Sequence, residues 1–258
     1  NRRVANDGDH TAMSRILYVI GYPFVFRAIK ERIGLRRVRY AASGAAPIAP
    51  EVIRDFLGLG VPLFELYGMT ENSAVATCNF PGANKVGTVG IPYPGTELRI
   101  DEDTGEIQTR NPGTFKGYWN KPEKTAEAFT EDGWLKTGDV GEWVDGTHVK
   151  VVDRIKDIII TGGFNVYPSE VEGVIRTHAG VVDVAVVGLP HEDGGEEVVA
   201  AVVLVEGVPV QPDELRAHTR GELTPYKVPR RVVFMDELPT NPMGKVLRRE
   251  VVTRLRER

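Results

Sequence analysis

The chain has 258 residues, of which 41% are hydrophobic, so it is long and apolar enough for one large domain or two ordinary ones with a packed core. Its 32 basic and 36 acidic side chains give a net charge of −4, and no basic stripe with interleaved aromatics is present, which argues against nucleic acid and for small molecules as partners. A single cysteine, Cys78, excludes an intrachain disulfide and favours a cytoplasmic location, and the five histidines lack metal-ligand spacing.

A β-α-β unit is expected early in the chain, and with it a parallel sheet. RRVRYAAS and VPLFELYG are rich in strand formers, and IAPEVIRDFLG between them carries an apolar helical face. That face consists of Ile48, Val52, Ile53, Phe56 and Leu57. The polar turns SGAAP and YGMTE follow the two strands. Because open α/β sheets bind ligands at the carboxyl ends of their strands, these turns are candidate ligand sites.

A β-rich subdomain is predicted from about residue 86 to residue 153, where short alternating strands are separated by turn residues. One hairpin pairs TELRI with EIQTR around DEDTG, and another pairs GEWVD with HVKVVD around Asp145-Gly146. From residue 154 the pattern predicts a compact α+β domain of about 100 residues. The expected domains are therefore 1–153 and 154–258.

The first helix of this C-terminal domain is expected to begin with a capping box formed by Ser169 and Glu172. Strands are predicted at VVDVAVVG, EVVAAVVLVE and RRVVFM, and a second helix near DELRAHTRGEL.

Several polar turns carry residues of catalytic type, yet each also has an ordinary structural explanation. Thr70 and Glu71 could cap a helix, and Asp139 could form an Asx-turn. Gly162 and Gly163 could form a tight turn, and Lys245 could be a solvated side chain. Gly244-Lys245 resembles the end of a Walker A loop, but Val246 stands where that loop requires Ser or Thr.

Taken together, the turns are similar in order and spacing to the signature blocks of the adenylate-forming superfamily, which includes acyl-CoA synthetases, peptide-synthetase adenylation domains and luciferases. The matching blocks run from about residue 36 to the end of the chain. They are RYAASGAAPIAPEV, ELYGMTE, GTVGIPYPGTELRI, GYWNKPEKTAEAF, DGWLKTGDVG, DRIKDIIITGGFNVYPSEVE and YKVPRRVVFMDELPTNPMGKVLRRE. The resemblance implies an α/β plus α+β fold: the last part of a large α/β AMP-binding domain with its β-rich subdomain, then a small mobile α+β domain.

The resemblance also implies a reaction with two halves. A carboxylate attacks the α-phosphate of ATP to give acyl-AMP and pyrophosphate, and the thiol of coenzyme A then displaces AMP. Tyr67 is expected to stack on adenine, Thr70 to contact phosphate, and Glu71 to hold Mg²⁺, since a carboxylate is a hard oxygen ligand. The GAAP turn, Gly44, Ala45, Ala46 and Pro47, is similar to the segment that lines the adenine and the acyl carboxylate, where small residues permit close backbone approach. Gly68 is also expected to bind the nucleotide.

In the second half of the chain, the resemblance makes Asp139 and Arg154 contacts of the ribose, and Lys156 the hinge at which the C-terminal domain rotates between the two half-reactions. Lys245 would bridge the acyl carboxylate and the α-phosphate during adenylation, a role suited to an ammonium on a flexible stem. The pantetheine tunnel of the other state would be lined by the backbone of Gly162 and Gly163.

One departure concerns the Ser/Thr/Gly-rich loop, ending in Pro-Lys-Gly, that wraps the β- and γ-phosphates in this family, because no such segment is found here. The chain also does not begin with Met. We therefore expect a C-terminal fragment that is incomplete for pyrophosphate release, exposes core surface on residues 1–153 and self-associates there.

The stretch FRAIKERIGLRRVRYAASGAAPIAPEV resembles long-chain fatty acyl-CoA synthetases, so a medium- or long-chain fatty acid is the favoured substrate. The alternatives left open are an acyl-AMP ligase or adenylation module feeding a carrier protein, a luciferase-like use of the adenylate, and a non-catalytic nucleotide-binding fragment. The sequence shows no apolar run of membrane-spanning length and no signal-peptide pattern in its opening NRRVANDGDH, and peripheral association with membranes stays open.

Overall fold

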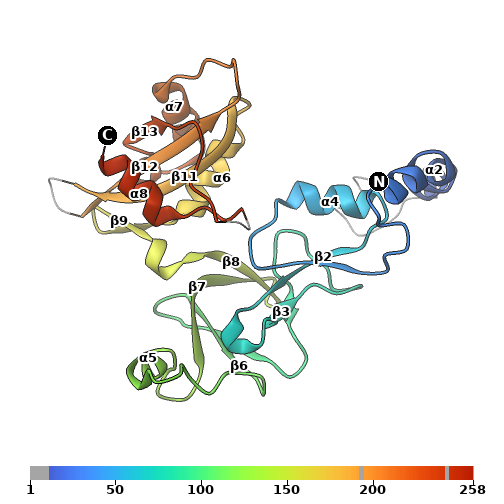
Figure 1. Ribbon diagram of the computed structural model, residues 1–258, viewed down its shortest axis with the longest axis horizontal. Coiled ribbons are helices and arrows are strands. Elements are labelled where there is room, and N and C mark those ends of the chain that lie inside the picture. The colour runs from blue at the N-terminus through green and yellow to red at the C-terminus, as the bar shows by residue number, and fades with distance from the viewer. Residues whose placement is uncertain (1–11, 192–194, 242–243, 258) are drawn as a thin grey trace. The chain divides into compact units, whose positions relative to one another are not determined.

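The computed structural model describes residues 12–191, 195–241 and 244–257 (Figure 1). The opening NRRVANDGDH, in which we find no signal-peptide pattern, lies outside the described residues. The chain divides into two compact units, of which the first comprises residues 1–137 and 141–151, and the second residues 138–140 and 152–258. None of the helices described in these ranges has the length and apolar content needed to cross a membrane.

The described part of the first unit begins with helical segments that present apolar side chains to the surface. They are α2 (Ala12–Gly21), the π-helical η1 (Tyr22–Phe26) and α3 (Arg27–Arg32). Large exposed side chains follow one another along them: Met13, Ile16, Leu17, Val19, Ile20, Phe24 and Val25. Buried Lys30 is hydrogen-bonded, since its Nζ donates to the carbonyl of Gly60 at 2.9 Å. The exposure agrees with the core surface expected on residues 1–153, while self-association stays a prediction.

The β-α-β unit is confirmed, with parallel pairing that places Ala42 opposite Phe64. Its elements are β1 (Ala41–Ser43), α4 (Pro50–Gly58) and β2 (Leu63–Tyr67). The first strand is shorter than predicted, and the predicted helical face is wrong at its start. Pro50 occupies the first turn of α4 and holds Ala49 extended, so Ile48 precedes the helix. Val52 is 40% exposed, whereas Ile53 is 2% exposed and enters the core.

Two short antiparallel strands extend this sheet to the order β1-β2-β3-β4. They are β3 (Thr77–Cys78) and β4 (Ile91–Pro92), neither of which the sequence pattern predicted. A second sheet has the order β5-β6-β7-β8 and contains both predicted hairpins. Its strands, with the helix that lies between β6 and β7 in sequence, are β5 (Glu97–Ile100), β6 (Glu106–Arg110), α5 (Pro122–Glu127), β7 (Leu135–Val144) and β8 (His148–Arg154).

The two hairpins turn as their residue types require. Asp101 Oδ1 accepts a hydrogen bond from the backbone N–H of Thr104 at 2.9 Å, which closes the first turn. The second turn has φ of 53° at Asp145 and 72° at Gly146, the left-handed pair that a two-residue hairpin needs. Residues 138–140 of β7 and the end of β8 from Val152 group with the second unit.

The second unit is an α+β fold around the sheet β11-β12-β13, in which β11 and β12 are antiparallel and β12 and β13 are parallel. A small hairpin, β9 with β10, precedes it. In chain order the elements are η3 (Ile155–Asp157), β9 (Ile159–Thr161), β10 (Phe164–Val166), α6 (Pro168–Arg176), β11 (Val181–Pro190), β12 (Glu196–Leu204), α7 (Pro212–Glu222), η4 (Pro225–Lys227), β13 (Arg231–Phe234) and α8 (Arg248–Arg256). The predicted strands and helices of this unit are confirmed, whereas α8 was not predicted.

Strand alternation gives this sheet two buried faces. Val186 on β11 packs with Val171 and Ile175 of α6 and Leu215 of α7 in one core cluster. The neighbouring residues of β11 and β12 point the other way and pack against α8, where Val251 is 0% exposed. Each such fully buried side chain contributes roughly 1.5–3 kcal/mol relative to exposure. Helices therefore cover both faces of this sheet.

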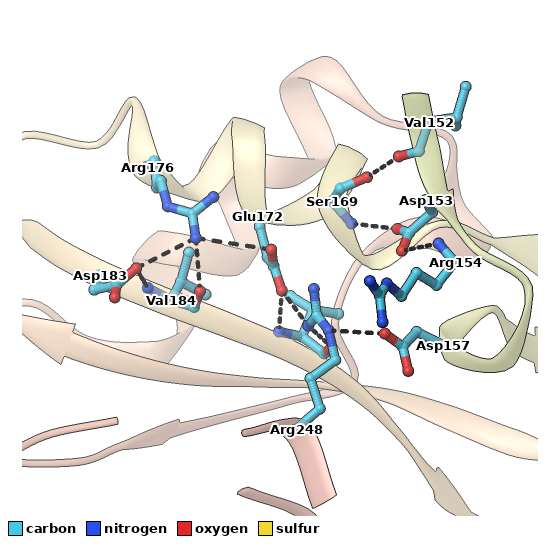
Figure 2. A network of polar contacts seen from close by, with 11 residues as sticks. Val152, Asp153, Arg154, Asp157, Ser169, Glu172, Arg176, Asp183, Val184 and Arg248 are labelled. Carbon is cyan, nitrogen blue, oxygen red and sulfur yellow. Dashed lines mark hydrogen bonds and ion pairs between the residues drawn. The ribbon is translucent and has the colours of Figure 1, made fainter. Parts of the chain in front are cut away.

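The predicted capping box at Ser169 and Glu172 is wrong (Figure 2). Pro168 occupies the first turn of α6, and no side chain of the N-cap residue caps the helix. Asp153 does so from β8 instead, because its Oδ2 accepts the backbone N–H of Ser169 at 2.8 Å. The Ser169 hydroxyl donates to the carbonyl of Val152 at 2.5 Å. The end of β8 is thus fastened to the start of α6.

Candidate active site

In the first unit, the two predicted turns lie at the same edge of the sheet, because β1 and β2 run parallel with Ser43 opposite Glu65. Beyond β2, Thr70, Glu71 and Asn72 form a single 3-10 turn, η2 (Thr70–Asn72). Buried Asn72 fixes this turn, since its Oδ1 accepts the backbone N–H of Met69 at 2.8 Å. The alternative that Thr70 and Glu71 merely cap a following helix is therefore wrong.

Glu71 is held at both its backbone and its side chain. Its carbonyl accepts the N–H of Phe115 at 2.7 Å, and its Oε1 accepts the hydroxyl of Tyr118 at 2.8 Å. This hydrogen bond, followed by burial and the carboxylate charge, raises the pKa of Tyr118 above its ordinary value. Sequence reasoning missed Tyr118, although it lies in the quoted GYWNKPEKTAEAF block, because nothing in its spacing indicates contact with Glu71. Thr70 is exposed beside it.

Packing of the chain itself restricts the predicted glycines of this edge, through backbone at Gly68 and through the flexible end of a side chain at Gly44. A Cβ at Gly44 would lie 2.5 Å from Cδ1 of Leu66, and one at Gly68 would lie 2.3 Å from the carbonyl oxygen of Ala74. Ala45 has a φ of 69°, in the left-handed region. Ala45 and Ala46 are exposed, and Tyr67 is half-buried at the end of β2. These residues form a tight, small-residue rim whose contact with a nucleotide stays a prediction.

In the second unit, Asp139 and Arg154 form an ion pair, with 3.3 Å between Arg154 Nε and Asp139 Oδ1. The Asp139 side chain is 13% exposed and that of Arg154 is 43% exposed. Asp139 lies within β7, so the alternative of an Asx-turn residue is wrong. The Asp139 carboxylate is thus mostly buried, whereas the Arg154 guanidinium, at the end of β8, reaches solvent.

Lys245 directly precedes Val246, which forms a β-bridge with Thr240, and lies in the segment that we call the Lys245 loop. Asn241 shapes this loop, since its N–H donates to the carbonyl of Lys245 and its Oδ1 accepts the N–H of Lys245, both at 2.9 Å. Gly244, with a φ of 80°, makes the turn. The lysine is therefore fixed at its backbone while its side chain remains at the surface.

Electrostatics connects Lys245 with the predicted ribose and hinge residues. Burial of the amine lowers the pKa of Lys245, the charge of Arg154 lowers it further, and Asp139 opposes the shift. The charge of Lys156 also lowers this pKa, and that of Asp157 raises it. These five side chains give a surplus of positive charge, which suits a phosphate group. Lys245 is exposed, and the charges of Asp139, Arg154 and Lys156 act on its amine.

Gly162 and Gly163 form the turn between β9 and β10, with φ of 56° and 82°. The tight-turn explanation is confirmed, since Gly-Gly readily adopts two successive left-handed positions. Apart from its chain neighbours, no described residue has a heavy atom within 4 Å of a Cβ placed at either glycine. The turn therefore leaves open space beside its backbone, and its role in a pantetheine tunnel stays a prediction.

The predicted site residues consequently form two sets, one in each unit. Across residues 12–191, 195–241 and 244–257, no cluster of three or more His, Cys, Asp and Glu side chains is arranged to hold a metal. Two family models match the chain: AMP-binding enzyme over residues 10–119, and AMP-binding enzyme C-terminal domain over residues 170–245.

The chain belongs to the AMP-binding enzyme family. Among relatives in this family, a long-chain-fatty-acid–CoA ligase of Bacillus subtilis is 42% identical over 230 residues, which cover 84% of this chain and 41% of the relative. A feruloyl-CoA synthase of Amycolatopsis sp. is 38% identical over 254 residues, which cover 92% of this chain and 51% of the relative.

Among solved AMP-binding enzymes, ATP-bound MatB from Rhodopseudomonas palustris superposes with a TM-score of 0.81 at 38% identity, over 88% of this chain and 47% of that one. The chain thus spans about half the length of the curated relatives it matches. The α/β plus α+β fold with a β-rich subdomain is confirmed.

Proposed function

We propose that this chain carries the adenylate-handling and domain-rotating half of an AMP-forming acid–thiol ligase. In the first step a carboxylate oxygen bonds to the α-phosphorus of ATP, and the bond to the β-phosphate oxygen breaks to release pyrophosphate. In the second step the sulfur of coenzyme A bonds to the acyl carbon, its proton is lost to solvent, and AMP leaves. The observation that supports the proposal best is the ion pair of Asp139 and Arg154, whose charges also act on the amine of Lys245.

The proposed roles follow from charge. Lys245 would neutralise the anions that meet at the α-phosphate, and preorganised charge of this kind lowers a barrier because no solvent must reorient. Asp139 would accept hydrogen bonds from the ribose hydroxyls, and Arg154 would hold the sugar edge while steadying Asp139. Tyr67 and the small residues of the first unit would bind adenine, and Thr70 would bind phosphate.

Glu71 fits a magnesium ligand by its donor chemistry. Mg²⁺ is bound in nucleotide enzymes by one or two carboxylates, with substrate phosphates and water supplying the rest. Glu71 offers one half-buried carboxylate whose orientation is set by Tyr118. When bound, the ion would neutralise phosphate charge. In our proposal the chain contributes Glu71 to that site and ATP contributes the other oxygens.

For the substrate we propose a medium- or long-chain fatty acid, and for the compartment the cytoplasm. Similarity to the Bacillus subtilis ligase supports the acid, whereas the feruloyl-CoA synthase shows that a relative of nearly equal identity is named for an aromatic acid. A carrier protein as acceptor is the second candidate. A luciferase-like use of the adenylate and a non-catalytic nucleotide-binding role complete the alternatives.

We further propose that the part of the chain beyond Lys156 rotates about this residue between the half-reactions. Two features of the second unit support this. Lys245 and the turn at Gly162 and Gly163 serve different steps in our account, yet both belong to the same compact unit. Lys156 lies in the short η3 turn that directly follows β8, where a few backbone dihedrals can absorb a rotation.

The test is a set of assays on a complete enzyme carrying this chain. Fatty acids of graded length and ferulate are supplied with ATP, and AMP release is measured with coenzyme A, with a phosphopantetheinyl carrier protein and with no acceptor. We expect release that requires coenzyme A and is fastest with a fatty acid. Release that requires the carrier protein would favour the second candidate, and nucleotide binding without release would remove the ligase proposal.

A further inference from the structure

Arg248, the first residue of α8, makes more polar contacts than its place in the helix requires (Figure 2). Its Nη1 donates to Glu172 Oε1 at 2.5 Å and to the carbonyl of Val186 at 2.8 Å. Its Nε lies 3.6 Å from Asp157 Oδ2. One guanidinium therefore joins α6, β11 and η3 to the segment that carries Lys245.

The central contact is a charge pair between a buried carboxylate and a partly buried guanidinium. The Glu172 side chain is 7% exposed and that of Arg248 is 24% exposed. Glu172 Oε1 also accepts the N–H of Val186 at 2.9 Å, and Arg176 lies 3.7 Å from its Oε2. Burial acts to lower the pKa of Arg248, but the hydrogen bond and charge of Glu172 and the nearby aspartates outweigh it, so the net shift is upward. A buried pair with its remaining lone pairs satisfied holds one geometry.

The stability of α8 does not explain Arg248. The helix is fastened by its apolar side, where Val251 is 0% and Leu255 is 3% exposed in the second core cluster. A cation in the first turn of a helix faces the positive end of the helix dipole, which is unfavourable. The guanidinium must therefore gain its place from contacts outside α8.

Those contacts lead to the hinge. Asp153 accepts the N–H of Ser169 on α6 and the N–H of Arg154, both at 2.8 Å. The segment 152–157, which carries Arg154 and Lys156, is thus bonded to the start of α6, and Arg248 bonds to the same helix one turn later. Arg248 also pairs with Asp157 at the end of that segment.

We propose that Arg248 is a positioning residue, which in the adenylation state clamps the segment that carries Lys245 to α6 and to residues 152–157, so that Lys245 keeps its position relative to Asp139 and Arg154. The meaning of this placement for adenylation rests on the proposed function, whereas the placement itself does not. An arginine is required because its planar fork serves a carboxylate, a carbonyl and a second carboxylate at once, which a lysine point charge does not.

The placement is tested by NMR on the 258-residue chain with its lysines ¹³C-dimethylated, the Lys245 signal being assigned from Lys245→Arg. We compare Arg248→Lys and Arg248→Met with Arg249→Met, a matched control at the exposed next position. In the wild type and the control, Lys245 should titrate below an ordinary lysine. In both Arg248 variants the pKa of Lys245 should rise towards the ordinary value. Because Arg248→Lys keeps the positive charge, a rise in that variant shows that the Lys245 amine has moved.

A complete enzyme carrying the same variants gives the functional readout. Adenylation should fall at least about tenfold in Arg248→Met, with transfer from supplied acyl-AMP retained, since a misplaced catalytic group commonly costs one to two orders of magnitude. Glu172→Gln keeps Arg248 and removes the charge of its partner, so it should also reduce adenylation. This variant replaces Arg248→Met in the test if Arg248→Met does not fold. An unchanged Lys245 titration in folded Arg248→Lys and Glu172→Gln would overturn the clamp. A shifted titration in an enzyme that never adenylates would support the clamp and reject the proposed function.

Discussion

Replacing Lys245 with alanine should separate the two half-reactions. An ammonium about 4 Å from a phosphate charge interacts by roughly 4 kcal/mol at an effective dielectric constant of about 20. Loss of one preorganised donor typically costs about 2.7–4 kcal/mol, or roughly 10²–10³ in rate. Because Arg154 and Lys156 remain within electrostatic reach of the same point, they keep part of the field. We therefore expect the lower end, a loss of about a hundredfold in adenylation.

The assay measures each half alone in a complete enzyme: ATP–pyrophosphate exchange for adenylation, and thioester formation from supplied acyl-AMP and coenzyme A for transfer. Arg249→Met, an exposed cation in the same segment, is the control and should change neither half. Transfer should be largely intact in Lys245→Ala, because in our account the lysine has rotated away in that state. If both halves fall alike while the protein stays folded, Lys245 is not a state-specific catalytic residue and the reasoning fails.

Four further predictions concern the pH profile, the glycine turn, the hinge and the sheet edge. Burial and neighbouring cations lower the pKa of Lys245, so its ammonium loses a proton at a lower pH than a free lysine does. Adenylation should therefore decline on an alkaline limb below pH 10.5, and Lys245→Arg should move that limb to higher pH. A limb that does not move in Lys245→Arg belongs to another group. Gly163→Leu, at a φ of 82°, should slow transfer roughly tenfold or more and spare adenylation, and a normal transfer rate in half-reaction assays would count against the tunnel. Lys156→Pro should reduce one half-reaction far more than the other, whereas equal small losses would argue against a hinge. The Cβ of Gly68→Ala would lie 2.3 Å from a backbone carbonyl oxygen, so this variant should lower the free energy of unfolding by about 1–3 kcal/mol in thermal or urea unfolding. Gly173→Ala, which has open space around its Cβ, is the control and should not be destabilised. Equal unfolding midpoints in the two variants would contradict the packing argument.

The elements that the sequence predicted correctly have local signals. Asp145-Gly146 predicts a two-residue hairpin because both positions tolerate a left-handed backbone, and the structure has that turn. Runs of valine and alanine predict β11 and β12, which are buried on both faces. In each case the residues that form the element also carry the information for it.

The errors came where distant residues compete with local ones. Ser169 and Glu172 have capping-box spacing, but Asp153 caps α6 from 16 residues earlier, and Glu172 is taken by Arg248 from 76 residues later. Helix α8 is mostly charged, with Val251 and Leu255 as its buried anchors, so it depends on the sheet face that it covers.

The site shows the same division. Resemblance selected Lys245, Asp139 and Arg154 singly, and nothing in their spacing indicates that they approach one another. Their proximity follows from where β7, β8 and the Lys245 loop meet within the second unit. Tyr118 and Arg248 were missed for the same reason, since each acts on a residue far away in sequence, Tyr118 on Glu71 and Arg248 on Glu172.

In our proposal, this chain belongs to an enzyme that adenylates a carboxylic acid with Lys245 at the reacting phosphate. The most direct measurement is acid-dependent ATP–pyrophosphate exchange in a complete enzyme carrying this chain, with the acyl-AMP trapped by hydroxylamine. The account predicts exchange and a trapped hydroxamate with a fatty acid in the wild type, both reduced about a hundredfold in Lys245→Ala. Exchange that proceeds equally in both proteins, or nucleotide binding without any exchange across the panel of acids, would contradict it.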